Sequence, residues 1–361
     1  MIRKLNRLLQ NYMREKRLKI GKFIWDRKEK KETIKGNRFI EDNNIKSIIF
    51  LRYDGKIGDM IINTLMFREL KKFYPYIKIG VVVRGNAKDI IKENPYVDKI
   101  YDYEKTKKKI KKLAKKIRNE NYDLLIDFSE ILRVNEMMLI NLAKARFNIG
   151  IKKENWNLFD ISLDIRDFQK HISKMYEKLL SFLGISDINL SYDLYPTNYV
   201  LKQYNLQKEA YIIFNPFAAS KHRSFSEENI IKILNLLEKK YKNILLIGEE
   251  KKLNLLEKVQ KYENIIIYKT KELNELIEII KNAKLIITPD TAIVHIASNY
   301  NKNSICFYRK EKYKKDKNSN FWGPNSTNAK IIYIEKEVKN GEEININDFD
   351  LISFAEELEK I

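Results

Sequence analysis

The chain has 361 residues, of which 44 % are hydrophobic and 33 % charged, so it is long enough for two domains with buried cores. Its single cysteine, Cys306, excludes a disulfide framework within the chain and is expected to be a small core residue in a strand. The formal net charge of +21 suits nucleic acid, anionic lipid or a phosphorylated substrate, although a lysine-rich composition alone also explains much of it.

Hydropathy and composition indicate where the protein is located and which of these partners it binds. No apolar run reaches the roughly 18 residues of a membrane-spanning helix, and the N-terminus lacks the apolar block of a signal peptide. We therefore expect a cytoplasmic protein. The chain shows no cluster of Arg and aromatic residues typical of a nucleic-acid-binding module, so we expect no nucleic-acid partner.

The first 31 residues are the most basic part of the chain. They hold twelve Lys and Arg against three acidic residues, for a net charge of +9. Apolar residues recur there at helical spacing: Ile2, Leu5, Leu9, Tyr12 and Met13. This pattern is typical of a helix lying on an anionic membrane surface, and we expect peripheral contact with the cytoplasmic face of the inner membrane. A helix packed on its own domain and an unstructured tail are the alternatives.

From residue 45 onward, short apolar runs alternate with amphipathic segments. The apolar runs predict strands at residues 45–53, 77–84, 98–103, 122–129 and 147–151. The segments between them predict helices at residues 58–73, 87–97, 105–121 and 131–145. The pattern loosens between residues 160 and 205, which hold a predicted helix at 170–183 and read as a connection between domains.

The alternation then resumes. Strands are predicted at residues 210–216, 243–248, 264–268, 283–290, 303–309 and 330–334. Helices are predicted at residues 226–241, 250–261, 272–282, after Asp290, and at 347–360. Strands that alternate with helices of this length indicate parallel sheets with crossovers on both faces.

The predicted fold is α/β, with two doubly wound domains in tandem. We expect a basic N-terminal segment at residues 1–40, a first domain at 41–190, a second domain at 191–345, and a C-terminal helix at 346–361. Ligands bind such sheets at the carboxyl ends of the strands, so the cleft between two facing sheets is the expected site.

The turn "LRYDGKIGDM" at residues 51–60 follows the first strand. Gly55 and Gly58 allow a tight turn, and the helix after them begins near Asp59. The spacing matches neither the G-x-G-x-x-G fingerprint nor a P-loop. Asp59 is therefore either a helix cap or a general base for a sugar hydroxyl.

The segment "TPDTAIVHIAS" at residues 288–298 ends a strand and begins a helix. The backbone N–H groups of Thr291 and Ala292, with the Thr291 hydroxyl, suit a diphosphate. His295 follows on the first turns of that helix as a further donor to a phosphate or a leaving group. Capping by Asp290 and a packed histidine are the structural alternatives.

Two more loops follow strands of the second domain. In "NPFAASKHRSFSEEN" at residues 215–229, Lys221, His222 and Arg223 suit an anionic diphosphate, or else form a solvated basic turn. Gly248 and Glu249 end the next strand, where a carboxylate can accept hydrogen bonds from a nucleoside.

Taken together, these segments resemble glycosyltransferase family 9, the ADP-heptose:lipopolysaccharide heptosyltransferases. The resemblance rests on the opening strand, the Gly58-Asp59 pair before a helix, "NPYVD", and the D-T-x-x-x-H-x-A segment, in that order, and covers about residues 45–335. It implies a GT-B fold, with an N-terminal domain for the acceptor sugar and a C-terminal domain for the nucleotide-sugar donor.

The same resemblance implies an inverting transfer without a covalent intermediate, in which Asp59 is the catalytic base. No metal-ligand cluster is visible in the sequence, and we expect no cofactor. It assigns donor binding to Ala219, Ser220, Arg223, Glu249 (or Glu250), Asp290, Thr291, Ala292 and His295. It assigns acceptor binding to Arg52, Gly55, Lys56 and Gly58. The implied partners are ADP-heptose and a lipid-linked oligosaccharide of the lipopolysaccharide core.

The chain departs from the family pattern at a few positions. Ala292 stands where the family has Gly, and the basic loop reads Lys221-His222-Arg223-Ser224. Transfer from another nucleotide sugar to another surface glycan is therefore an alternative, and a non-catalytic nucleotide- or polyanion-binding protein is a second one of a different class.

Overall fold

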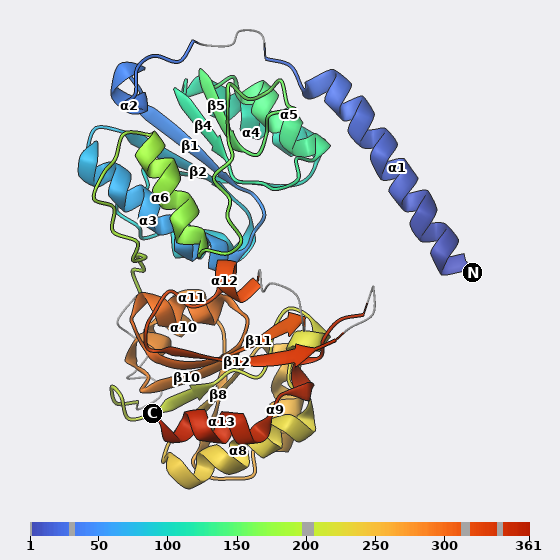
Figure 1. The fold of residues 1–361 in the computed structure, drawn as a ribbon, viewed down its shortest axis with the longest axis vertical. Coiled ribbons are helices and arrows are strands. Elements are labelled where there is room, and N and C mark those ends of the chain that lie inside the picture. The colour runs from blue at the N-terminus through green and yellow to red at the C-terminus, as the bar shows by residue number, and fades with distance from the viewer. Residues whose placement is uncertain (1, 29–32, 197–205, 312–317, 338–341) are drawn as a thin grey trace. The chain divides into compact units, whose positions relative to one another are not determined.

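The computed structural model describes residues 2–28, 33–196, 206–311, 318–337 and 342–361, and for residues 2–8 only the backbone of a helix. The chain divides into two compact units. The first comprises Met1–Lys56, Met66–Arg166 and Met175–Asn189; the second comprises Ile57–Leu65, Asp167–Lys174 and Leu190–Ile361. Each unit contains a parallel six-stranded sheet flanked by helices (Figure 1).

The first sheet has the strand order β3-β2-β1-β4-β5-β6. Its strands are β1 (Ser47–Arg52), β2 (Lys78–Val83), β3 (Lys99–Asp102), β4 (Leu124–Asp127), β5 (Phe147–Ile151) and β6 (Ile161–Leu163). All residues of β1, β4 and β5 are buried, which is the pattern of strands covered on both faces. The winding reverses between β1 and β4, so the loop after β1 lies at the switch point of this sheet.

Helices cover both faces of the first sheet. They are α2 (Phe39–Asp42), α3 (Ile57–Phe73), the 3₁₀ turn η1 (Gly85–Ile90), α4 (Lys107–Asn119), α5 (Val134–Ala143) and α6 (Ile172–Phe182). Helix α1 (Ile2–Trp25) packs on α5. The Phe67 ring of α3 packs on Phe50 of β1 with centroids 5.2 Å apart, and α4 and α5 bury their apolar sides against the opposite face. Helices α3 and α6 each begin in the second unit and continue in the first.

The second sheet has the strand order β12-β11-β10-β7-β8-β9. Its strands are β7 (Ile212–Phe214), β8 (Ile244–Gly248), β9 (Ile265–Lys269), β10 (Leu285–Pro289), β11 (Asn303–Glu311) and β12 (Ala329–Lys336). Its winding reverses between β7 and β10. The loops after these two strands therefore emerge side by side at one sheet edge.

The helices of the second unit pack on both faces of its sheet. They are η2 (Lys221–Arg223), α8 (Glu227–Lys240), η3 (Glu250–Lys252), α9 (Leu253–Val259), α10 (Leu273–Asn282), α11 (Ala292–Asn299), α12 (Asn318–Trp322), η4 (Ile346–Asp348) and α13 (Leu351–Glu359). The rings of Phe225, Phe307, Phe349 and Phe354 interlock in its core, with centroids 5.0–6.5 Å apart. Cys306 is fully buried in β11, as predicted.

The predicted α/β fold with two doubly wound sheets is confirmed. One predicted helix is different: the segment after β2 forms only the 3₁₀ turn η1, because Pro95 disfavours a helical conformation at Asn94 and leaves little chain for a helix. Helix α1 is longer than its apolar spacing indicated, and the short helix α12 was not predicted. No helix among the described residues is long and apolar enough to span a membrane.

Candidate functional site

Two buried polar residues join the loops at the switch point of the second sheet. Asn215 directly follows β7, and Thr288 is near the end of β10. The Asn215 amide Nδ2 donates to Thr288 Oγ1 at 2.9 Å, and the Thr288 and Thr291 hydroxyl oxygens lie 3.1 Å apart. These bonds hold the two loops in register. Sequence reasoning missed Asn215 and Thr288, although a polar residue at the end of a core strand was the available signal.

The loop after β7 is tied into a compact turn by Ser224. The backbone N–H of Ala218 donates to Ser224 Oγ at 3.0 Å, and the same hydroxyl lies 3.1 Å from the Ser220 carbonyl oxygen. Ala219 at the turn is exposed, and Ser220 is half-buried. Because both side chains are short, a ligand can approach the backbone at this turn.

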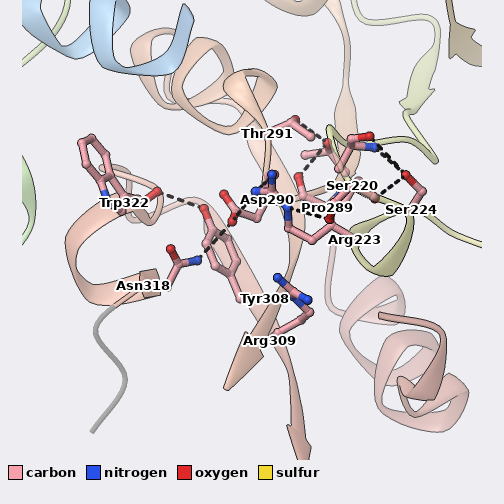
Figure 2. Close-up of polar contacts among 12 residues, drawn as sticks. Ser220, Arg223, Ser224, Pro289, Asp290, Thr291, Tyr308, Arg309, Asn318 and Trp322 are labelled. Carbon is pink, nitrogen blue, oxygen red and sulfur yellow. Dashed lines mark hydrogen bonds and ion pairs between the residues drawn. The ribbon is translucent and has the colours of Figure 1, made fainter. Parts of the chain in front are cut away.

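Arg223 and Asp290 form an ion pair across the switch point. Arg223 Nη1 lies 3.2 Å from Asp290 Oδ2, and Arg223 Nε donates to Ser220 Oγ at 3.4 Å. Asn318 of α12 donates to the same carboxylate oxygen at 3.1 Å (Figure 2). The structure therefore brings together the predicted residues Ser220, Arg223 and Asp290. It adds Asn318, which no sequence pattern indicated.

Helix α11 begins at this site, directly after Asp290. Thr291 is its N-cap, and its hydroxyl accepts a hydrogen bond from the backbone N–H of Ile293 at 3.3 Å. The Ala292 amide is the first of the helix and has no carbonyl partner within the helix. The helix dipole places about half a positive charge at this end, which favours an anion. The predicted alternative that Asp290 caps this helix is wrong, because Thr291 is the cap. The cradle at Thr291 and Ala292 stays a prediction.

His295 is buried on α11 among other aromatic side chains. Burial, and to a smaller extent the nearby His171, lower the pKa of His295 to about 3, so its imidazole is neutral. Burial also lowers the pKa of His171 to about 4. The Tyr192 ring centroid lies 6.5 Å from that of His295. His295 Nδ1 is buried and has no hydrogen-bond partner among the described residues, which leaves one ring nitrogen unused in the protein.

The start of α3 belongs to the same compact unit and approaches His295. A Cβ atom built on Gly58 would lie 2.7 Å from His295 Cδ2 and 3.2 Å from His295 Nε2, so only glycine fits there. Asp59, the next residue, is buried in the first turn of α3. Gly58, the neighbour of the predicted base Asp59, thus lies against the predicted donor residue His295.

The remaining predicted acceptor residues lie in the loop before α3. Arg52 ends β1, is buried, and forms an ion pair with Asp54 at 3.2 Å. Gly55 has φ of +75°, and a Cβ there would also lie 3.2 Å from the Arg84 carbonyl oxygen. Lys56 is exposed and occupies the N-cap position of α3 without a side-chain capping bond. The glycine is therefore needed for the turn.

Glu249 is at the same sheet edge but farther from α11. It directly follows β8, is exposed, and pairs with Lys251 at 2.5 Å. Because β7 lies between β8 and β10, Glu249 is separated from Asp290 by one intervening strand. The predicted role of Glu249 in donor binding therefore stays a prediction.

Comparisons with known proteins identify relatives of this chain. Residues 110–347 match the family model of glycosyltransferase family 9 (heptosyltransferase). Lipopolysaccharide heptosyltransferase 1 of Campylobacter coli is 23 % identical over 330 residues, which are 83 % of this chain and 93 % of that protein. Lipopolysaccharide core heptosyltransferase OpsX of Haemophilus influenzae is 21 % identical over 276 residues, 73 % of this chain and 79 % of that protein.

Solved structures show the same fold. A glycosyl transferase family 9 protein from Veillonella parvula superposes with a TM-score of 0.70 at 17 % identity, covering 87 % of this chain and 96 % of that one. Escherichia coli ADP-heptose lps heptosyltransferase II superposes with a TM-score of 0.66 at 17 % identity, covering 87 % of this chain and 98 % of that one. The predicted GT-B fold class and the sequence resemblance are both confirmed.

Proposed function

This chain belongs to glycosyltransferase family 9, the heptosyltransferases, and from that premise we propose that it transfers a heptose from ADP-heptose to a lipopolysaccharide core acceptor. Two relatives that match most of the chain are named as lipopolysaccharide heptosyltransferases. The observation that carries the proposal is the ion pair of Arg223 with Asp290 beside the N-terminus of α11. A cation and the first backbone amides of a helix lie together there, at the switch point of the sheet, where an anionic ligand is expected to bind.

In this proposal the donor diphosphate lies against the start of α11. The Ala292 amide and the Arg223 guanidinium contact its oxygens, and the small residues Ala219 and Ser220 allow it to approach the loop backbone. Thr291 shapes the helix start as its cap, and Asp290 orients Arg223. Glu249, one strand farther along the edge, accepts hydrogen bonds from the nucleoside hydroxyls.

Asp59 acts as the general base of an inverting, single-displacement transfer. Its carboxylate takes the proton of the acceptor hydroxyl, and the hydroxyl oxygen forms the new bond to C1 of the heptose. The bond from C1 to the diphosphate oxygen breaks at the same time, and its electron pair stays on the departing ADP.

Charge that develops on the leaving ADP is stabilised by Arg223 and by the N-terminal end of α11. His295 contributes as a neutral N–H donor, because its lowered pKa keeps the imidazole uncharged at neutral pH. The donor substrate supplies the reactive bond, and this proposal uses no cofactor.

The acceptor side of the proposal rests on the loop before α3. Arg52, Gly55, Lys56 and Gly58 contact the acceptor sugar, and the exposed Lys56 suits an anionic or phosphorylated sugar. A lipid-linked acceptor requires the protein to work at the cytoplasmic face of the inner membrane. The basic N-terminal segment, with its net charge of +9, supports such a peripheral location.

A donor screen by thermal shift tests the proposal. We expect ADP-heptose to raise the melting temperature of the purified chain more than UDP-, GDP- or CMP-sugars do. Preference for another nucleotide sugar would leave the family and the role of Asp59 as base in place, but it would show that ADP-heptose is not the donor. Stabilisation by no nucleotide sugar would contradict the proposal and favour a non-catalytic protein.

A further inference from the structure

Helix α1 packs on the first unit through one of its two apolar faces. Leu18 and Trp25 pack against the apolar cluster of this unit. Between them, Gly21 lies on α5 so closely that a Cβ there would stand 2.5 Å from Val134 Cγ2. The Val134 side chain therefore packs directly on the Gly21 backbone, which any larger residue at position 21 would prevent.

The C-terminal end of α1 is also fixed by polar contacts. The Asn141 side-chain amide donates to the Trp25 carbonyl at 3.1 Å and to the Arg27 carbonyl at 2.7 Å. The buried Asp26 carboxylate accepts a hydrogen bond from the backbone N–H of Leu158 at 2.9 Å. Lys28 forms an ion pair with Asp160. Helix α1 is consequently a rigid part of the first unit rather than a tethered tail.

The opposite face of α1 is apolar and exposed. Its members have side chains that are 48 % to 74 % exposed: Leu9, Tyr12, Met13, Ile20, Phe23 and Ile24. At about 100° per residue these six side chains fall within an arc of roughly 120° on the side opposite Leu18. They are half of the twelve large hydrophobic side chains that are exposed in the described part of the chain. We call them the outer face of α1.

Cations surround this outer face. Arg14, Lys16, Arg17 and Lys19 of α1 are all exposed. Helix α4, which packs on the other side of α5, contains seven Lys and one Arg without an acidic residue, and all eight are exposed. Lys109 among them pairs with Glu104. The helical layer of α1, α5 and α4 thus combines an unpartnered apolar stripe with a dense positive charge.

A groove runs between α1 and the start of α5 on the same layer. It has a volume of about 870 Å³, and its apolar lining includes Leu9, Met13, Leu18 and the 70 % exposed Ile131. Its charged lining consists of the cations Arg14, Arg17, Lys105 and Arg133 and of one acidic residue, Glu136. The apolar side chains of this groove can contact an acyl chain, and its guanidinium groups can bind a phosphate.

We propose that the outer face of α1, with this groove, is a docking surface for an anionic phospholipid bilayer. The apolar side chains enter the interface, and the cations of α1 and α4 meet lipid phosphates. Because α1 is fixed to α5, binding orients the whole first unit on the membrane. This orientation serves the proposed function, since the first unit begins the loop proposed to hold a lipid-linked acceptor, but binding itself requires no catalysis.

The same features argue against other occupants. A nucleic acid would neutralise the cations but leave six apolar side chains in water. A second copy of this chain would cover the apolar stripe but bring two strongly basic layers together. An anionic bilayer satisfies both features at once.

Co-flotation of the full chain with vesicles tests the proposal. We expect binding to vesicles of phosphatidylcholine with phosphatidylglycerol, and much weaker binding to phosphatidylcholine alone. The double variant Ile20→Ser, Phe23→Ser should lose at least about tenfold in partitioning, because two inserted apolar side chains are removed. Ile352→Ser, which changes a 70 % exposed side chain of α13, is the matched control and should bind as the parent does.

Three results would overturn the proposal. They are equal binding to neutral and anionic vesicles, unchanged binding of the double variant, or a parent chain that is a dimer in solution while the double variant is a monomer. Circular dichroism and melting temperature verify that the double variant is folded. A Gly21→Leu variant tests the fixed orientation: it should still bind vesicles but transfer sugar more slowly to a bilayer acceptor than to a detergent-dispersed one. Vesicle binding without any sugar transfer would refute the proposed function and leave this inference intact.

Discussion

Replacement of Arg223 by alanine tests the chemistry of the donor site. The guanidinium pairs with Asp290 at 3.2 Å, but the two side chains are 30 % and 20 % exposed, so solvent screens the pair. We expect its loss to lower the free energy of unfolding by no more than about 1 kcal/mol. Asp290 also keeps its hydrogen bond from Asn318 in the variant.

The effect on catalysis should be much larger than the effect on stability. In the proposed transition state Arg223 meets charge that develops on the departing ADP. Loss of one such preorganised donor costs about 10²–10³ in kcat, or about 2.7–4 kcal/mol. Arg223→Lys keeps the charge but cannot reproduce the contacts of Nε with Ser220 and Nη1 with Asp290, and should recover only part of the rate.

The assay is kcat and KM for heptose transfer, measured together with chemical denaturation. Arg146→Ala is the matched control: its guanidinium pairs with Asp123 at 3.9 Å and stands over Phe147, at the amino end of β5. We expect a similar stability change and unchanged kcat for the control. If Arg223→Ala kept kcat within about threefold of the parent while both variants were folded, the assignment of leaving-group stabilisation to Arg223 would be refuted.

Two further predictions concern His295. Gly58→Ala places a methyl group 2.7 Å from His295 Cδ2, and we expect it to cost about 1–3 kcal/mol of stability and about 10²-fold in kcat/KM. In a His295→Ala background the added methyl has room, so a double-mutant cycle in which the two effects simply add would contradict the close contact. Burial lowers the pKa of His295 to about 3 and of His171 to about 4, so below about pH 6.5 the unfolded chain binds more protons than the folded one. Each histidine should therefore remove about 1.4 kcal/mol of stability per pH unit as the pH falls from about 6 to about 4.5. Urea denaturation of His295→Asn should show a shallower pH slope than the parent; an equal slope would exclude His295 as a source.

Local sequence patterns predicted most of the fold. Strands β1 and β10 appear as apolar runs, and helices α3 and α8 as amphipathic periods. Because these patterns involve only neighbouring residues, they can be recognised from the sequence alone. The N-cap of α8 is a local feature of the same kind, because the Ser226 hydroxyl accepts a hydrogen bond from the Asn229 N–H at 3.3 Å.

The parts that could not be predicted depend on contacts between distant segments. Asn318 meets Asp290 through α12, a helix of five residues that is too short to have a readable period. His171 lies near His295 although 124 positions separate them in the chain, so the joint lowering of their pKa values has no local signal. The exposed apolar face of α1 was predicted only as far as Met13, and its continuation through Ile20, Phe23 and Ile24 was missed.

The most direct test of the central claim is a transfer assay read by mass spectrometry. The purified chain and its Asp59→Ala variant are incubated with ADP-heptose and a heptose-free core lipid, and donor binding is measured in parallel. The account predicts that the parent chain adds one heptose to the lipid, while Asp59→Ala binds ADP-heptose with nearly unchanged affinity but makes no product. Turnover of Asp59→Ala at the parent rate, or transfer by the parent from another nucleotide sugar in place of ADP-heptose, would contradict it.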